Sequence, residues 1–555
     1  MTMTLDQKPR AADAAAAQIE RLWTLQKLAL GPVGYFAALA EGDDEILAVG
    51  AANVLLDQDV VPDALRGRMV ALATYQSVQL RAFDFFIADY DYERARAVLE
   101  TPLRPTDALI KRQFAATLGV DPAEMATIEI ERFFRTGEVG PLAAAAEAAE
   151  NAGGWRRALP FVVDLILLNP QNGGWAVWLG RMLRDANRFD LLARFCEIVE
   201  QIKVFPHISQ IFRALLASKE DAAREGLKLI DGVSVKNAPT DGLVLMAGIK
   251  AELFEKLGRY EDAYNAYLKQ NRLLGGDDAD PPLFARGVLA KAALDIDGLS
   301  PPGRDSHFIM CSFARSGTTL LEYALGSHPR VEAFEEPPSF ASVHHLFRPT
   351  LVDGRPLVAD FAAKARERYY REIDRRKKKA DADIFVDKQP MLAAEARFLR
   401  KLFPEKRYIF IIRHPYDVVL SCFKQAFARN VAMDNFLTFG DACRAYDFTM
   451  GQWFGIFGFE SPEVCYVRYD RLVLDFKAEV SRVLAFLGAD WHDDILNFAE
   501  RAEQREVKTP SYAKVRAGVS IGVQTAWRNY AFLFKRQEAR PLDRWAKLFG
   551  YETVA

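Results

Sequence analysis

Residues 308–321, which read FIMCSFARSGTTLL, restrict the fold of this chain more than any other stretch. The apolar start predicts a short buried strand, the small residues after it predict a tight turn, and an apolar helix follows directly. This arrangement directs several backbone N–H groups and the positive end of a helix dipole to one point, which suits a phosphate group. The segment therefore predicts a phosphate-binding loop at the end of a strand.

The loop differs from the nucleotide-binding pattern G-x-x-x-x-G-K-[ST] in two places. Gly317 and Thr319 fit the pattern, but Ser312 replaces the first glycine and Thr318 replaces the lysine. In ATP-using loops that lysine reaches the β- and γ-phosphates, and the hydroxyl after it holds Mg²⁺. We therefore expect this loop to hold a phosphate without transferring a γ-phosphoryl group, with Arg315 supplying positive charge.

At 555 residues the chain exceeds one ordinary domain, and its composition is that of a globular protein. No apolar run is long enough to cross a bilayer, and the N-terminus lacks the apolar segment of a secretory signal. Five cysteines without C-x-x-C spacing indicate reduced thiols rather than disulfides or zinc ligands. We expect a cytoplasmic protein without a nucleic-acid partner.

Two proline- and glycine-rich breaks, at 275–282 and 301–303, place the main domain boundary near residue 300. Residues 1–300 show helical spacing of apolar residues almost throughout. A loosely repeated element begins at Trp155, Phe189, Glu220 and Tyr260, and an earlier copy is suggested at Tyr92. The period of 31 to 40 residues is close to that of a tetratricopeptide repeat, which GRYEDAYNAY resembles. The sequence predicts an all-α array of such repeats, with a generic helical bundle as the alternative.

Residues 301–555 change to short apolar strands separated by helical segments, the pattern of a parallel α/β sheet. The expected strands are 307–312, 331–334, 384–387, 407–412 and 464–469. Ligands of such sheets bind beyond the carboxyl ends of the strands, where this chain places charged residues after every strand. This convergence predicts an enzyme site.

A second anion pocket is expected after the strand 407–412. Arg413 stands at the end of this strand, Pro415 opens a helix, and Ser421 lies within that helix. A guanidinium forks onto phosphate oxygens, so an arginine and a hydroxyl at such a junction suit a second phosphate. Two phosphate pockets on one sheet imply a ligand with two separated phosphate groups.

These segments together resemble a known family. SFARSGTTLLEYALGSHPRV, EE, VDKQP, IIRHPYDVVLSCF, VRYDRLV and KTPSYAKVRAG follow the order found in sulfotransferases that use 3′-phosphoadenosine 5′-phosphosulfate (PAPS). The similarity covers about residues 305–550 and is greatest to bacterial tetratricopeptide-linked sulfotransferases, with tyrosylprotein sulfotransferases as more distant relatives. It implies a P-loop-like parallel-sheet sulfotransferase domain at 301–555 that converts PAPS to 3′-phosphoadenosine 5′-phosphate.

The resemblance also implies roles for single residues. Glu336 is expected to be the general base for the acceptor, and Lys388, Arg315 and Ser511 are expected to stabilise the transferring sulfuryl group. The residues expected to bind the donor are Arg315, Ser316, Gly317, Thr318 and Thr319 at the 5′-phosphosulfate, Arg413 and Ser421 at the 3′-phosphate, and Tyr469 and Arg516 along the site. No metal ion is expected, since the positive side chains can compensate the charge of sulfuryl transfer.

Alternatives remain open from the sequence alone. Glu335 could act as the base in place of Glu336, and so could His344 or His345. The α/β half could be a nucleotide-dependent kinase, or the chain could be a non-catalytic repeat scaffold that binds nucleotide. The acceptor could be a hydroxyl or amine of a protein or peptide presented by the repeat surface, a saccharide or a small molecule.

Overall fold

The computed structural model describes residues 11–89, 91–103, 122–219, 222–233, 240–275, 281–296, 304–337, 339–357, 360–498 and 525–554. The chain divides into two compact units, the first ending at Ile249 and the second beginning at Lys250. The boundary expected near residue 300 stays a prediction from composition. Within the described ranges, no helix combines the length and hydropathy needed to span a bilayer.

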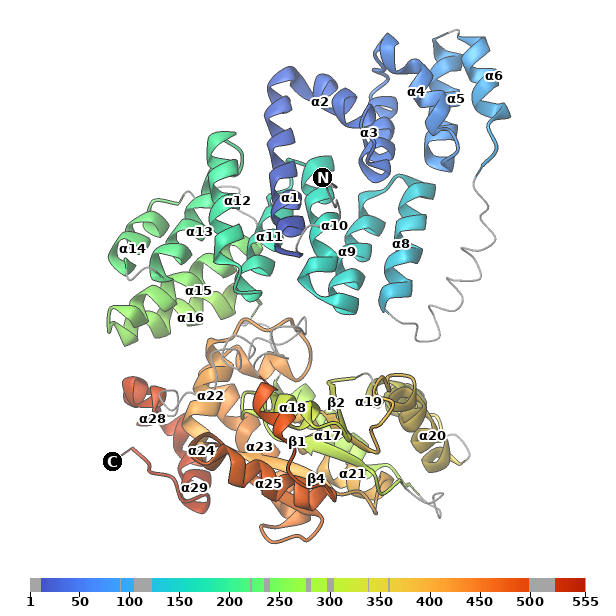
Figure 1. Ribbon diagram of the computed structural model, residues 1–555. Helices are drawn as coiled ribbons and strands as arrows, with labels where there is room; N and C mark the ends of the chain where they lie inside the picture. The colour runs from blue at the N-terminus through green and yellow to red at the C-terminus, as the bar shows by residue number, and fades with distance from the viewer. Residues whose placement is uncertain are drawn as a thin grey trace, which may run out of the picture. The chain divides into compact units, whose positions relative to one another are not determined.

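The first unit is built from helices, as expected for residues before the boundary. Their bounds are α1 Ala11–Glu20, η1 Arg21–Leu30, α2 Gly31–Ala40, α3 Glu45–Asp57, η2 Asp63–Leu65, α4 Arg66–Leu72, α5 Gln76–Ala88, α6 Tyr92–Glu100, α8 Pro122–Thr136, α9 Val139–Gly153, α10 Trp155–Leu168, α11 Gly173–Asp185, α12 Phe189–Gln201, α13 Pro206–Lys219 and α14 Ala223–Asp231. From α8 to α14 each helix packs against the next one (Figure 1).

The repeated sequence element coincides with helix starts. Tyr92, Trp155 and Phe189 are the first residues of α6, α10 and α12, and Tyr260 is the first residue of α16 (Tyr260–Leu273). Glu220 lies outside the described residues, and α14 begins three residues after it, at Ala223. A helix pair that buries its apolar face against its neighbours gives this succession. The packing is not purely sequential, because α1 also contacts α10 and α12, and α3 contacts α10. The tetratricopeptide assignment of these pairs stays a prediction.

The second unit contains a five-stranded parallel sheet, as the sequence predicted. Its strands are β1 His307–Cys311, β2 Val331–Glu335, β3 Ile384–Lys388, β4 Tyr408–Ile412 and β5 Val464–Arg468, in the order β2-β3-β1-β4-β5. Every neighbouring pair is parallel, and each expected strand agrees with the observed one to within a residue at either end. The chain builds β2 and β3 on one side of β1, and β4 and β5 on the other. Such a change of direction places a crevice at the carboxyl ends of the central strands.

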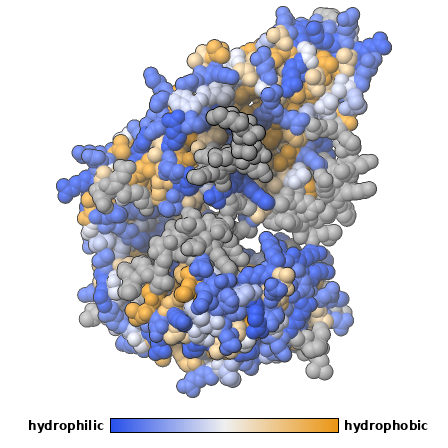
Figure 2. Space-filling model, viewed as in Figure 1, coloured by the Kyte–Doolittle hydropathy of each residue, from blue (hydrophilic) through white to orange (hydrophobic). Residues whose placement is uncertain are grey.

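Besides the sheet, the second unit consists of helices, several of which flank the strands (Figure 1). Their bounds are α16 Tyr260–Leu273, α17 Pro281–Ala293, α18 Thr318–Ser327, α19 Ser339–Asp353, α20 Phe361–Asp374, η4 Pro390–Glu395, α21 Ala396–Leu402, α22 Pro415–Lys424, η5 Met433–Phe436, α23 Phe439–Phe457, α24 Tyr469–Leu474, α25 Phe476–Leu487, η6 Asp493–Asn497, η8 Ala526–Tyr530, α28 Ala531–Phe534, η9 Gln537–Ala539 and α29 Arg540–Leu548, and α15 Thr240–Lys256 crosses the division between the units. The visible face of this unit is largely hydrophilic (Figure 2), since the apolar side chains gather in the core.

The second unit includes α16, the last helix in which the repeated element occurs. Asn271 on α16 donates hydrogen bonds from Nδ2 to the carbonyl oxygens of Phe423 (2.9 Å) and Phe436 (3.4 Å). Glu255 accepts hydrogen bonds from Lys424 and Tyr530. These buried and partly buried polar contacts hold the carboxyl end of α22 against α15 and α16, because buried polar groups without partners cost free energy.

The five cysteines are all buried and unpaired, as their spacing predicted. Burial raises the pKa of the Cys311 and Cys422 thiols well above the ordinary value. A thiol that stays protonated is a poor nucleophile, which makes both structural rather than reactive.

Candidate active site

The loop after β1 has the geometry of an anion-binding turn. Arg315 and Gly317 both take positive φ angles, of 66° and 104°. Gly317 is the N-cap of α18, so the loop opens directly onto the amino end of that helix. Ser312 secures the base of the loop, since its hydroxyl donates to the carbonyl oxygen of Ile411 at 2.6 Å. The loop thus directs backbone N–H groups toward the carboxyl edge of the sheet.

The residues of the second expected anion pocket lie against this loop. Nε of Arg315 donates a hydrogen bond to Oγ of Ser421 at 3.2 Å, and Nη1 of Arg413 donates to the carbonyl oxygen of Arg315 at 3.1 Å. The Arg413 guanidinium lies 4.7 Å from the centre of the Tyr469 ring. Arg315, Arg413 and Tyr469, which follow three different strands, are therefore brought together with Ser421 of α22 at the carboxyl ends of the strands.

The electrostatics of this edge favour an anion. Burial lowers the pKa of the Arg315 guanidinium, and the nearby positive charge of Arg413 lowers it further. Both effects penalise the cationic form. A phosphate or sulfate group between the two arginines would offset them, because it would restore an opposite charge at hydrogen-bonding distance.

Lys388 lies at the centre of a carboxylate cluster. Its side chain is fully buried, and Nζ lies 2.9 Å from Oε2 of Glu322, 3.3 Å from Oε1 of Glu336 and 3.8 Å from Oε1 of Glu335. The register of β2 against β3 pairs Glu335 with Lys388, which explains why these residues meet. Burial by itself lowers the pKa of a lysine, but the carboxylates raise that of Lys388 above its ordinary value. The ammonium therefore stays charged.

Glu336 leaves the sheet in an uncommon backbone conformation. Its φ angle is 43°, and its N–H donates to the carbonyl oxygen of Lys388 at 3.1 Å. A non-glycine residue in the left-handed region costs on the order of 1 kcal/mol or more, so the surrounding structure must hold it there. The side chain is 49% exposed, whereas that of Glu335 is 18% exposed. Glu336 is thus the more accessible carboxylate beside Lys388.

The remaining sequence candidates lie apart from this cluster or outside the described residues. The His344 ring lies 3.7 Å from a carboxylate oxygen of Glu395 and 3.5 Å from Nζ of Lys291. The side chain of His345 and the whole of Ser511 and Arg516 lie outside the described residues. The expected roles of Ser511 and Arg516 stay predictions.

One residue of the cluster was missed by reasoning from the sequence. Glu322 stands in the second turn of α18 and is fully buried. A glutamate within the apolar sequence TTLLEYAL was the available signal, since a buried charge is almost always paired.

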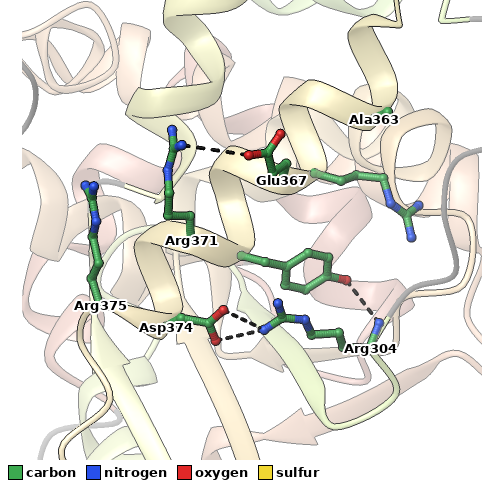
Figure 3. A pocket seen from close by; sticks show the side chains of 8 residues that line it. Arg304, Ala363, Glu367, Arg371, Asp374 and Arg375 are labelled. Carbon is green, nitrogen blue, oxygen red and sulfur yellow. Dashed lines mark hydrogen bonds and ion pairs between the residues drawn. The ribbon is translucent and has the colours of Figure 1, made fainter.

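A hollow of about 600 Å³ lies elsewhere in the second unit, along α20 (Figure 3). It includes Arg304, which precedes β1, and Asp374, which ends α20 ahead of β3, so it opens at the amino ends of the strands. Its arginines are paired with carboxylates: Arg304 with Asp374 at 2.7 Å and Arg366 with Glu405. The hollow therefore lies near the amino ends of the strands, whereas Lys388 lies at the carboxyl end of β3.

The described residues contain no group of three or more His, Cys, Asp or Glu side chains arranged to hold a metal ion. The carboxylates around Lys388 are engaged with its ammonium instead.

Comparison with known proteins agrees with this architecture. Residues 308–493 match the model of the sulfotransferase family, a range that begins in β1 and ends at the start of η6. The second unit therefore carries a sulfotransferase-family domain.

One relative and several solved structures are similar to parts of the chain. An uncharacterized protein of Aquifex aeolicus (strain VF5) is 24% identical over 309 residues, which are 50% of this chain and 39% of that protein, so the chain spans well under half of its length. The sulfotransferase domain of the Synechococcus PCC 7002 olefin synthase is 18% identical over 46% of this chain and 98% of that domain, with a TM-score of 0.32. The sulfotransferase domain of the curacin biosynthetic pathway is also 18% identical, over 46% of this chain and 100% of that domain, with a TM-score of 0.32. At such TM-scores the assignment of the domain rests on the family model.

Proposed function

We propose that this chain is a sulfotransferase that uses PAPS as donor and transfers its sulfuryl group to an acceptor hydroxyl or amine. The observation that carries this proposal is the position of Lys388. Its buried ammonium stands between carboxylates at the carboxyl edge of the sheet, one of which, Glu336, is half exposed. A charged lysine beside an accessible carboxylate supplies both requirements of sulfuryl transfer, namely charge compensation and proton removal.

The loop residues and the arginines fit the two ends of the donor. Residues 315–319 would hold the 5′-phosphosulfate through backbone N–H groups, their hydroxyls and the Arg315 guanidinium. Arg413 and Ser421 would hold the 3′-phosphate, since the guanidinium can fork onto phosphate oxygens. The contacts of Arg315 with both residues support one continuous site for a doubly phosphorylated nucleotide.

The reaction then requires one proton transfer and one exchange of bonds to sulfur. The Glu336 carboxylate accepts the acceptor proton as the acceptor oxygen or nitrogen forms its bond to sulfur. The bond between sulfur and the bridging oxygen of the 5′-phosphate breaks, and 3′-phosphoadenosine 5′-phosphate leaves with that oxygen. Lys388 and Arg315 compensate the negative charge on the sulfuryl and bridging oxygens. We infer the base role for Glu336 rather than Glu335 because of its greater exposure.

The acceptor class is proposed from the first unit. Stacked helix pairs present extended surfaces that commonly bind peptides or proteins. We propose a protein or peptide acceptor presented by these helices, with a saccharide or small molecule as the alternative outcome of the test.

A radiolabel experiment tests the function. The chain is incubated with PAPS carrying ³⁵S and a cell extract, and the labelled products are separated by size and treated with protease. Transfer of label by the wild-type chain but not by Glu336→Gln supports the proposal. Absence of any label transfer, together with no binding of 3′-phosphoadenosine 5′-phosphate, contradicts it.

Donor binding is measured separately by thermal shift. A ligand present at 100 times its Kd stabilises the native state by about 2.7 kcal/mol. We expect this stabilisation from 3′-phosphoadenosine 5′-phosphate in EDTA. Stabilisation by ATP with Mg²⁺ alone would favour a kinase instead.

A further inference from the structure

Glu322 and Lys388 form a buried ion pair between two elements of the site. Glu322 belongs to α18, the helix that begins at the phosphate loop, and Lys388 is the last residue of β3. Both side chains are fully buried, and the oxygen and nitrogen lie 2.9 Å apart. The pair thus connects the anion-binding helix to the lysine that faces the proposed reaction.

The three carboxylates around Lys388 are not equivalent. Glu336 and Glu335 are partly exposed and lie farther from Nζ, at 3.3 and 3.8 Å. Solvent screens the charge of a partly exposed carboxylate, and water can take its place as a partner of the ammonium. A fully buried carboxylate is neither screened nor replaced in this way. Glu322 belongs to α18, whereas Glu335 ends β2 and Glu336 follows it. It can therefore hold the ammonium without competing with the acceptor for Glu336.

A buried lysine without an anionic partner loses its proton, because the low-dielectric interior penalises the ammonium. Removing one member of a buried pair leaves an uncompensated charge and is costly for that reason. The protonated state of Lys388 accordingly depends most on Glu322, the fully buried partner that solvent cannot replace. A neutral amine at this position could not compensate the negative charge on the sulfuryl oxygens.

We propose that Glu322 is a positioning residue for sulfuryl transfer, which keeps Lys388 charged and directed at the sulfuryl group without itself touching the substrates. This inference rests on the proposed function, since it assigns Lys388 the charge-compensating role. It adds a residue to the site from a helix position that none of the sequence motifs singled out.

The pH dependence of kcat separates this role from a purely structural one. In the wild-type chain we expect no loss of activity up to pH 10 from deprotonation of Lys388. In Glu322→Gln, which preserves size but removes the charge, we expect a basic limb that begins below pH 10, on which kcat falls about tenfold per pH unit. Binding of 3′-phosphoadenosine 5′-phosphate should change less than kcat.

Two further variants identify the origin of that limb. Glu322→Gln combined with Lys388→Arg should lack the basic limb, because a guanidinium does not deprotonate in this range. Glu332→Gln is the matched control. Glu332 is a buried glutamate of β2 that accepts hydrogen bonds from the backbone N–H groups of Lys378 and Lys379. Its profile should be that of the wild type, even if its melting temperature falls.

The proposal is overturned if Glu322→Gln keeps the wild-type profile, or if the basic limb persists in the double variant. An inactive wild-type chain would instead count against the proposed function. In that case the ¹³Cε signal of Lys388, assigned by its loss in Lys388→Arg, is titrated by NMR. Titration below pH 10 in Glu322→Gln alone supports the positioning role, and identical titration in both chains rejects it.

Discussion

The Tyr469 ring lies directly against Gly317, so that a Cβ added to the glycine would stand 2.2 Å from Cδ2 of the ring. Tyr469 follows β5 and Gly317 follows β1, so the contact joins an edge strand to the phosphate loop. Gly317 also has a φ angle of 104°, which side chains rarely adopt. Two independent constraints therefore require glycine at this position.

Gly317→Ala should consequently disturb the loop. We expect a destabilisation of about 1 to 3 kcal/mol from the strained backbone and the clash, with loss of nucleotide binding. Gly451→Ala is the control, because Gly451 lies in α23 with nothing within 4 Å of an added Cβ. That substitution should be neutral or stabilising by up to about 1 kcal/mol. Thermal melting and binding of 3′-phosphoadenosine 5′-phosphate measure both effects.

Glu336→Gln should lower transfer activity by about 10²- to 10⁴-fold, the usual contribution of a general base. Donor binding should change little, since Glu336 lies beside Lys388 and outside the phosphate loop. Activity is measured with ³⁵S-labelled PAPS and binding by calorimetry. Equal losses in Glu336→Gln and Glu335→Gln would argue against a single base.

The buried pair of Glu322 and Lys388 should show strong coupling in stability. Lys388→Met leaves the Glu322 carboxylate buried without its partner, which should cost about 3 to 5 kcal/mol. Adding Glu322→Gln should recover part of that loss, because the uncompensated charge is removed. Urea unfolding of the two single variants and the double variant provides the cycle. Simple additivity of the two losses would contradict the expected coupling.

Lys379 should matter for stability although it belongs to the basic run RRKKK. Its ammonium donates to the carbonyl oxygens of Gly326 (2.5 Å), His328 (2.9 Å) and Val331 (2.7 Å), between the end of α18 and the start of β2. Lys379→Met should destabilise the chain by about 2 kcal/mol, since the hydrogen bonds from the ammonium to these three carbonyl oxygens are lost. Lys378→Met, which removes an exposed neighbouring side chain, should leave the melting temperature unchanged.

His307 should make stability depend on pH below neutrality. Burial, followed by the positive charge of Lys406, lowers the pKa of this histidine from 6.5 to about 3. Between pH 6.5 and about 3, His307 is therefore neutral in the native state, whereas the same histidine is protonated in the unfolded chain. Stability present above pH 6.5 is lost as the pH falls, by at most about 1.4 kcal/mol per pH unit.

The variant His307→Asn tests this dependence. Its unfolding free energy, measured by urea titration from pH 7 to pH 5, should fall less steeply than that of the wild type. His492→Asn is a control for the exposed histidines, since that side chain is 47% exposed. A slope unaltered by His307→Asn would show that other groups dominate.

Local features of the sequence predicted much of this structure. The five strands were expected from apolar runs between turn residues, and each appears where expected because a buried parallel strand has to be apolar throughout. The repeated element predicted the starts of several helices, since the turn and the residue after it are local properties. The turn from β1 into α18 was expected for the same reason, because its glycine and its helix adjoin in sequence.

Tertiary structure alone decided which distant side chains meet. Glu322 joined the site because α18 turns that face toward the end of β3, an orientation set by packing of the helix on the sheet. A run such as RRKKK is typical of a solvated helix face, yet Lys379 folds back onto three carbonyl oxygens of a preceding segment. The pairing register of β2 and β3 set Glu335 and Glu336 beside Lys388. Such contacts depend on the sum of many weak packing terms along the chain, which no short motif records.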